Sequence, residues 1–176
     1  MRQNKDNLIL IGMAGAGKST LGVLLAKALG KNFFDTDLLI QQREGKLLQT
    51  ILDEDGVNYF LRAEEKAIRS LRLRGCVIAT GGSVVYSHSA MNHLSSGGRV
   101  IYLKIAYEEL AARLTNVTSR GIVFKGSPDL HSVYEERLPL YERYADLTVD
   151  CTGRSIEDCV NAIVSALRSA DGRETV

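Results

Sequence analysis

Short apolar segments alternate with amphipathic segments along the chain. Apolar runs rich in β-branched side chains predict strands at 8–12, 76–80, 99–105 and 147–150, and a weaker run predicts one at 33–35. Apolar residues at helical spacing predict helices at about 18–29, 57–74, 107–115, 130–144 and 155–168. This alternation is typical of a parallel sheet covered by helices, so the expected fold class is α/β.

One segment interrupts the alternation. Residues 116–129 contain two glycines and a proline and show little periodicity, which predicts a long loop. A loop of this length within a compact domain usually has a functional role.

Composition narrows the classes of partner. The chain has 176 residues, 45% of them hydrophobic and 24% charged, with a net charge of +1, as expected for one globular domain. This charge gives no field that would attract nucleic acid, and no apolar run is long enough to span a membrane. The chain has no pattern of a secretory signal. The cysteines, Cys76, Cys151 and Cys159, form no CxxC pair, which favours free thiols and a cytoplasmic location.

A phosphate-binding loop follows the first predicted strand. The stretch Gly12–Ser19 reads GMAGAGKS and fits G-x-x-x-x-G-K-[ST], with a strand before it and a helix after it. Glycines allow backbone N–H groups to face phosphate oxygens, and the helix start adds its positive dipole end. Lys18 is suited to the β- and γ-phosphates, and Ser19 is suited to Mg²⁺. The predicted nucleotide-binding residues are Gly12, Ala14, Gly15, Ala16, Gly17, Lys18, Ser19 and Thr20.

This motif predicts binding of a nucleoside triphosphate without identifying the reaction. Small-molecule kinases, GTPases and ATPases all use such a loop. The residues after the other strands therefore have to indicate where the phosphate goes.

Two aspartates and a glycine pair follow the next strands. Asp35 and Asp37 lie at the carboxyl end of the weak strand, where parallel sheets bind ligands. An aspartate there suits the proton of an acceptor hydroxyl or a water-mediated contact to Mg²⁺, but it equally suits the N-cap of a following helix. Gly81 and Gly82 indicate either close approach of a ligand or a tight turn.

Two arginines also have alternative interpretations. Arg120 lies in the long loop and is either a cation that meets the transferring phosphate when the loop closes or a solvated surface residue. Arg137 lies on the predicted helix 130–144, where it is either a ligand-binding cation or surface charge.

The chain resembles the shikimate kinase family over residues 7–168. The matching segments are GMAGAGKST, FFDTD, GVNYFLRAEE, ATGGS, the loop with Arg120, RLPLYERYAD and DCTGRS, in the family's order. The resemblance implies a P-loop fold of the nucleoside monophosphate kinase type, with a five-stranded parallel sheet, flanking helices and a lid. It also implies transfer of the γ-phosphate of ATP to the 3-hydroxyl of shikimate with Mg²⁺, in the cytoplasmic route to aromatic amino acids.

The resemblance assigns roles on the acceptor side. Asp37 corresponds to the aspartate that meets the substrate hydroxyl, as base or orienter. Gly81 and Gly82 correspond to backbone that contacts the substrate, and Arg137 corresponds to an arginine that binds the substrate carboxylate.

The resemblance also assigns roles on the nucleotide side. Lys18 holds the phosphates and Ser19 holds Mg²⁺, with Asp35 nearby. Arg120 corresponds to the lid arginine that reaches ATP, and Arg154 falls in the loop on the adenine side. Lys18, Asp37 and Arg120 are thus the expected catalytic residues.

The chain departs from the family pattern at the acceptor side. In G-E-x-x-F-R-x-x-E, the first glutamate is Val57 and the arginine is Leu61; the third glycine of the glycine stretch is Ser83. The missing arginine normally binds the shikimate carboxylate. Arg62 is the candidate replacement, although it lies about 100° further around a helix. The lid's usual Arg-Pro is Arg120-Gly121.

These observations predict a monomeric shikimate kinase consisting of one domain, 1–176, with a lid at about 116–128 and a substrate-binding segment at about 37–64. Its expected partner is a small hydroxy compound, with no nucleic acid and no membrane. The alternatives are a P-loop kinase of another small hydroxy compound, with Leu61 against an apolar part of it, and a regulatory protein that only binds nucleotide.

Overall fold

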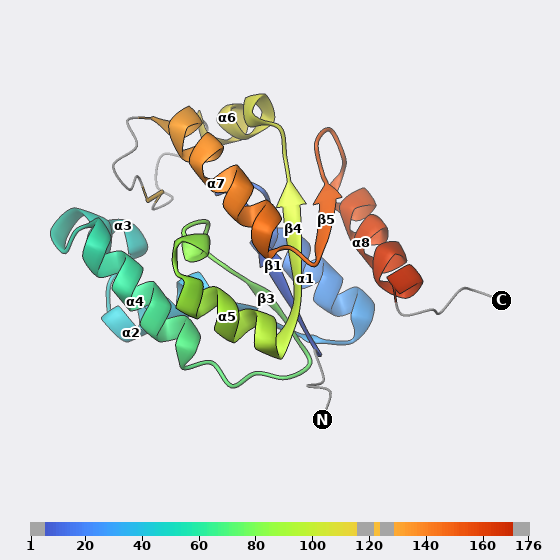
Figure 1. The fold of residues 1–176 in the computed structure, drawn as a ribbon, viewed down its shortest axis with the longest axis horizontal. Helices are drawn as coiled ribbons and strands as arrows, with labels where there is room; N and C mark the ends of the chain where they lie inside the picture. Colours follow the sequence, from blue (N-terminus) through green and yellow to red (C-terminus); the bar gives the residue numbers. More distant parts are fainter. Residues whose placement is uncertain (1–5, 116–121, 124–128, 171–176) are drawn as a thin grey trace.

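Five parallel strands form a single sheet in the computed structural model, which describes residues 6–115, 122–123 and 129–170 (Figure 1). The strand order is β2-β3-β1-β4-β5. This confirms the predicted α/β fold with a five-stranded parallel sheet. The strands are β1 (Asn7–Ile11), β2 (Asn32–Asp35), β3 (Cys76–Ala79), β4 (Gly98–Lys104) and β5 (Leu147–Asp150).

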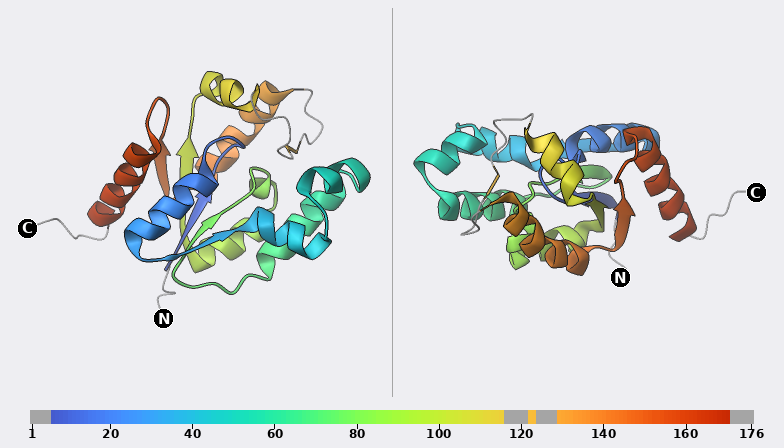
Figure 2. Two further views of the ribbon diagram at one scale, coloured as in Figure 1. Left: turned by 180° about the vertical axis from the view of Figure 1, so that it is seen from behind. Right: turned by 90° about the horizontal axis from the view of Figure 1, so that it is seen from above.

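Helices cover both faces of the sheet. The helices α1 (Lys18–Leu29) and α8 (Ile156–Ala170) lie on one face, and α5 (His88–Gly97) and α7 (Leu130–Tyr144) lie on the other (Figure 2). Three further helices, α2 (Thr36–Glu44), α3 (Leu48–Glu54) and α4 (Val57–Arg69), gather beyond strand β2. The helix α6 (Tyr107–Thr115) follows β4, and a short 3₁₀ helix, η1 (Val84–Tyr86), precedes α5.

The predicted elements with strong periodicity are confirmed, and the differences are local. Helices α2, α3 and α5 were not predicted, and the helix expected over 57–74 ends at Arg69. The early end has a physical reason, since the Ser70 hydroxyl donates to the carbonyl of Ala67 and so competes with the backbone. Asn7 then fixes the following segment by donating to the carbonyl of Leu73.

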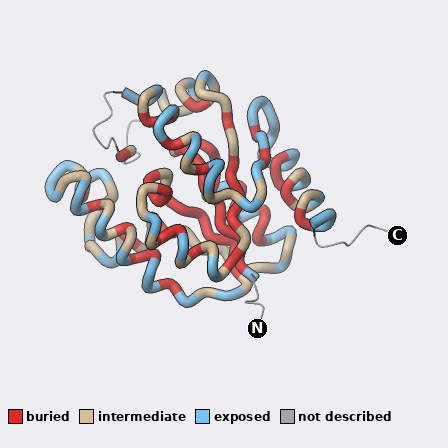
Figure 3. Tube along the Cα trace, viewed as in Figure 1, coloured by how far each residue is buried: buried red, intermediate tan, exposed pale blue. Residues whose placement is uncertain are grey.

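The core consists of the sheet and the helix surfaces that face it. Strand β1 is buried throughout. Figure 3 shows the buried, red segments gathered in the centre of the molecule. The rings of Tyr102 on β4 and Tyr141 on α7 stack with centroids 5.1 Å apart, which joins α7 to the sheet. A second, smaller apolar cluster of Ile40, Ile51, Phe60, Ala67 and Val123 joins α2, α3 and α4.

The topology brings the predicted site segments to one edge of the sheet. Because all five strands are parallel, the loops that follow β1, β2 and β3 leave the sheet at the same edge. Those loops carry the phosphate loop, the start of α2 and the stretch Gly81–Ser83.

Two further sequence expectations concern the chain as a whole. Among the described residues, no helix has the length and apolarity needed to cross a membrane. All three cysteines are buried free thiols.

The junction of α5 and β4 offers a test of how tightly the sheet is packed. A Cβ on Gly98 would lie 2.5 Å from the carbonyl oxygen of Asn7 and would clash with the Ile9 side chain, whereas one on Gly97 would meet nothing closer than 3.6 Å. Gly98→Ala is therefore expected to lower the free energy of unfolding by about 1–3 kcal/mol, because backbone has to shift. Gly97→Ala is the matched control, expected to be neutral or stabilising. Urea unfolding measures both; equal effects would contradict this packing.

Candidate active site

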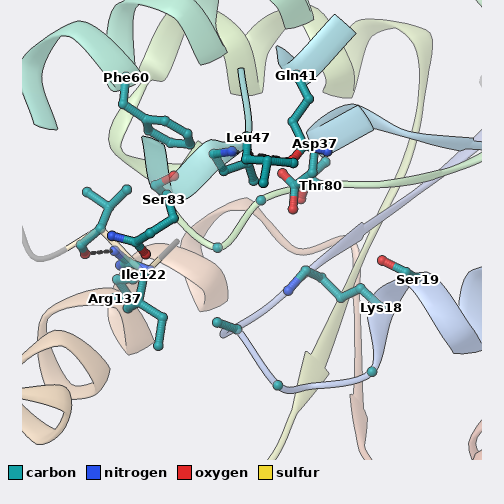
Figure 4. A pocket seen from close by; sticks show the side chains of 18 of the residues that line it. Lys18, Ser19, Asp37, Gln41, Leu47, Phe60, Thr80, Ser83, Ile122 and Arg137 are labelled. Atoms are coloured by element: carbon teal, nitrogen blue, oxygen red, sulfur yellow. Dashed lines mark hydrogen bonds between the residues drawn. The ribbon is translucent and has the colours of Figure 1, made fainter. Parts of the chain in front are cut away.

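A cavity of about 500 Å³ opens at the carboxyl edge of the sheet (Figure 4). Its walls come from the phosphate loop, α2, α3, α4, the loop after β3 and α7. The predicted site residues that line it are Ala14, Gly15, Gly17, Lys18, Ser19, Thr20, Asp37, Gly81, Gly82 and Arg137. The fold thus brings the predicted nucleotide side and the predicted acceptor side into one cavity.

The phosphate loop has the conformation that its glycines allow. Gly12 has a φ of 145°, and a Cβ there would lie 2.7 Å from the carbonyl oxygen of Leu103. Gly17 caps α1 in the left-handed region. Lys18 is only 8% exposed, and its ammonium donates to the carbonyls of Gly12 (2.8 Å) and Met13 (2.7 Å). The ammonium is therefore fixed over the loop where phosphate oxygens are expected.

The two aspartates after β2 have different positions. The carboxylate of Asp35 caps α2 by accepting from the backbone N–H of Asp37 at 2.9 Å, and its other oxygen accepts from the Ser19 hydroxyl at 2.7 Å. Asp35 is thus an N-cap and the partner of Ser19 at once. Asp37 lies within the first turn of α2, and its side chain lines the cavity.

The Ser19–Asp35 pair suits a magnesium ion. Mg²⁺ prefers oxygen ligands and keeps several waters, so it needs few protein side chains. A hydroxyl and a carboxylate in contact at the mouth of the phosphate loop fit this requirement. Among the described residues, no three acidic, histidine or cysteine side chains cluster as a larger metal site.

The glycine pair after β3 is required for space. A Cβ on Gly81 would lie 2.5 Å from Oε1 of Glu64 and 3.0 Å from Oδ1 of Asp37. A Cβ on Gly82 would lie 3.1 Å from Nη1 of Arg137 and 3.2 Å from the backbone nitrogen of Ala14. Neither glycine has a positive φ, so close approach of functional groups, rather than turn conformation, explains the pair.

Arg137 is a buried cation. Its side chain is 1% exposed, so the alternative of a surface charge does not hold. Its Nε donates to the Tyr86 hydroxyl at 3.1 Å, Nη2 donates to the carbonyl of Val123, and the guanidinium lies 4.9 Å from the centroid of the Tyr86 ring. It makes no ion pair with any carboxylate in the described part of the chain. A buried guanidinium with neutral partners favours binding of an anion.

Glu64 is a candidate site residue that the sequence pattern did not single out. It is 2% exposed and lies beside Asp37 over Gly81, while its Oε2 accepts from the Ser83 hydroxyl at 2.8 Å. Burial raises the pKa of Glu64 to about 8; Asp37 raises it further, and Ser83, Arg137 and Lys18 lower it. The sequence signal that could have identified Glu64 is its place at the end of the F-x-x-x-E stretch, where the chain keeps the glutamate of the family pattern.

Arg113, which the sequence pattern also did not single out, connects the phosphate loop with the loop after β5. Arg113 on α6 donates to the carbonyl of Gly15 at 3.1 Å and pairs with Glu109. Glu109 in turn accepts from the backbone N–H of Gly153 at 2.8 Å. This network connects the phosphate loop with the loop after β5, which carries Arg154.

Some predicted residues lie away from the cavity walls. Gly12, Ala16 and Asp35 do not line the cavity. Gly12 and Ala16 lie close together within the phosphate loop, and Asp35 accepts from the Ser19 hydroxyl. Arg154 is exposed in the loop after β5, and Arg62 is exposed on α4; neither lines the cavity. Arg120 lies outside the described residues, as does most of the predicted lid at 116–128.

Comparisons with known proteins agree with this geometry. The family model described as shikimate kinase matches residues 14–168. A shikimate kinase of Thiobacillus denitrificans is 38% identical over 174 residues, which cover 97% of this chain and 95% of that protein. A shikimate kinase from Acinetobacter baumannii, solved in complex with shikimate, superposes with a TM-score of 0.87 at 27% identity, covering 96% of both chains. The enzyme from Aquifex aeolicus superposes with a TM-score of 0.82 at 28% identity, covering 96% of this chain and 99% of that one.

The raised pKa of Glu64 predicts a pH-dependent stability. The pKa of Glu64 is about 8 in the folded state and has the ordinary value of 4.5 in the unfolded state. The stabilisation that Glu64 provides is therefore complete below pH 4.5 and is lost as the pH rises to about 8. We expect the free energy of unfolding to fall over this range by at most about 1.4 kcal/mol per pH unit relative to Glu64→Gln, which cannot titrate. Urea unfolding of both proteins from pH 5 to 9 tests this; parallel curves would exclude it.

Proposed function

The chain belongs to the shikimate kinase family and is an ATP-dependent phosphotransferase, and we propose that the cavity described above transfers the γ-phosphate of ATP to the 3-hydroxyl of shikimate. The observation that carries this proposal is the buried guanidinium of Arg137, which shares one cavity with Lys18 and Asp37. A carboxylate acceptor with hydroxyl groups needs a cation at one end and a proton acceptor at the other. The site supplies both, next to a phosphate loop.

On the acceptor side, the proposed roles follow from charge and position. Arg137 binds the acceptor carboxylate and so fixes the direction of the hydroxyl groups. Asp37 accepts the proton of the attacking hydroxyl as its oxygen bonds to the γ-phosphorus and the bond to the departing ADP oxygen breaks. The bare backbone of Gly81 and Gly82 lines the cavity and lets Asp37 and Arg137 approach it closely.

On the nucleotide side, Lys18 and the backbone of the phosphate loop hold the phosphates, and Arg120 meets the transferring phosphate from the lid. Ser19 would hold Mg²⁺, and Asp35, which accepts from the Ser19 hydroxyl, would support it. This ion would neutralise charge on the phosphate oxygens during transfer. We further propose that Arg154, and Arg113 with its contacts to Gly15 and Glu109, lie on the side of the nucleotide base.

The remaining assignments are proposals of the same kind. We propose one kinase domain over 1–176, with a lid at about 116–128 and a substrate-binding segment at about 37–64. Three free buried cysteines support a cytoplasmic location. A monomer is the proposed state.

The acceptor clamp lacks one cation of the family pattern. Leu61 packs against the apolar cluster of Phe60 and Val123, two residues that also line the cavity. Arg62 points to solvent, so its position does not support a role in the clamp. We therefore propose that Arg137 alone holds the acceptor carboxylate.

A coupled assay of ADP release tests the proposed function. Purified protein with ATP and Mg²⁺ is given shikimate, quinate, gluconate and uncharged polyols. We expect shikimate to give the highest kcat/KM. Higher turnover of another hydroxy compound would reassign the acceptor, and no transfer to any of them would favour a regulatory nucleotide-binding protein.

Asp37→Asn is expected to lower kcat for shikimate by about 100-fold or more while the Kd for an ATP analogue stays within about twofold, because a carboxamide cannot take the hydroxyl proton. Asp35→Asn provides the contrast. It is expected to raise the Mg²⁺ concentration needed for half-maximal rate, which Asp37→Asn leaves unchanged. Equal loss of nucleotide binding in Asp37→Asn would instead assign Asp37 to the metal or phosphate site.

Leu61→Arg is expected to lower KM for shikimate by about ten- to hundredfold, since a second guanidinium adds a charge-assisted hydrogen bond of roughly 1.5–3 kcal/mol to the carboxylate. Arg62→Leu is the matched control on the next position of α4, and its KM should equal that of the wild type. A large rise in KM in Arg62→Leu would show that Arg62 already serves the clamp.

A further inference from the structure

The Ser83 side chain makes a buried contact that the family pattern does not contain. Ser83 is 4% exposed, and its hydroxyl donates to Oε2 of Glu64 on α4 at 2.8 Å. The other oxygen, Oε1, is buried and has no hydrogen-bond partner among the described residues. The Ser83 hydroxyl is thus the one hydrogen-bond partner that the described structure gives to this carboxyl group.

The groups around Glu64 explain why its orientation matters. Asp37 on α2 faces it as a like charge, while Arg137 on α7 and Lys18 on α1 face it as cations. Oε1 of Glu64 and Oδ1 of Asp37 both lie within 3.0 Å of one point above Gly81. Two carboxyl groups this close do not both ionise readily, so the more buried one keeps its proton. Glu64 is that group, so a neutral carboxyl lies beside Asp37, the proposed base.

The sequence pattern connects Ser83 with Leu61. Residues 61 and 64 are three apart on α4 and therefore neighbours on its surface. An arginine at 61, as in the family pattern, would provide Glu64 with a cationic partner. In this chain Leu61 is packed into the apolar cluster, and a serine occupies the place of the third glycine.

We propose that Ser83 is a positioning residue of the acceptor site, whose hydroxyl holds the Glu64 carboxyl in place of the arginine missing at position 61. With Oε2 accepting from Ser83, the acid proton of Glu64 resides on Oε1, beside Asp37 and against the bare Cα of Gly81. Ser83 and Leu61 are then a coupled pair of replacements that keeps the Glu64 carboxyl fixed beside Asp37. This inference rests on the proposed function, because it assigns Asp37 as the base.

A double-mutant cycle tests the coupling. The wild type, Ser83→Ala, Leu61→Arg and the double variant are compared by kcat and KM for shikimate and by KM for ATP. Ser83→Ala is expected to lower kcat/KM for shikimate by about tenfold in the wild type but less than twofold in Leu61→Arg, because the arginine then holds Glu64. KM for ATP stays within about twofold throughout. An equal loss in both backgrounds would overturn the proposal.

A pH profile separates positioning from a merely structural role. Ionisation of Glu64 beside Asp37 is expected to reduce kcat/KM on the basic side of the profile. The bond from Ser83 favours the ionised form of Glu64, so Ser83→Ala raises the pKa of Glu64 and moves this basic limb to higher pH. In Leu61→Arg the limb moves to lower pH. A basic limb that stays in place in Ser83→Ala would contradict the proposal.

Ser87→Ala is the matched control. Ser87 also donates to a glutamate of α4, Glu65, at 2.7 Å, and it caps α5, but it does not line the cavity. Ser87→Ala should lower the melting temperature without changing the kinetics for shikimate. Wild-type turnover of shikimate is measured first: its absence would refute the proposed function, whereas normal turnover with an additive cycle would refute the role of Ser83 alone.

Discussion

The backbone at Gly81 and Gly82 has no room for a side chain because functional groups lie directly against it. The positions of both Asp37 and Arg137 in the cavity depend on this close packing. Gly81 brings its bare Cα against the carboxyl groups of Glu64 and Asp37, and Gly82 brings its own against the guanidinium of Arg137. The Tyr141 hydroxyl donates to the carbonyl of Gly82 at 2.6 Å and so fixes the segment to α7. One short stretch of chain therefore sets the spacing between the proposed base and the proposed carboxylate cation.

Charge is distributed in the cavity so that each ligand group meets a complementary group. Lys18 lies over the phosphate loop, and Arg137 lies at the other end with neutral hydrogen-bond partners. Burying a cation without a carboxylate partner costs free energy, and an anionic acceptor that pairs with Arg137 would offset this cost. Burial meanwhile raises the pKa of Glu64 to about 8, which removes one negative charge near the position of the acceptor at neutral pH.

The sequence predicted those features that depend on local pattern. The phosphate loop and the strands follow from apolar runs and glycine spacing, so they are found within a residue or two of their expected bounds. The sequence did not predict helices α2 and α5 because they are short and their apolar pattern is weak. Caps by Asp35 and Ser87, together with packing, stabilise them. The positions of Glu64 and Arg113 depend on contacts between segments that are distant in the sequence. The burial of Arg137 on α7 does too.

The central claim is that the guanidinium of Arg137 selects an acceptor by its carboxylate while Asp37 meets its hydroxyl. The most direct measurement is the affinity of the wild-type protein for shikimate and for its methyl ester, by isothermal titration calorimetry with an ATP analogue and Mg²⁺ present. The account predicts that the ester binds at least about tenfold more weakly, because it loses a charge-assisted hydrogen bond. Equal affinities for the acid and the ester would contradict it.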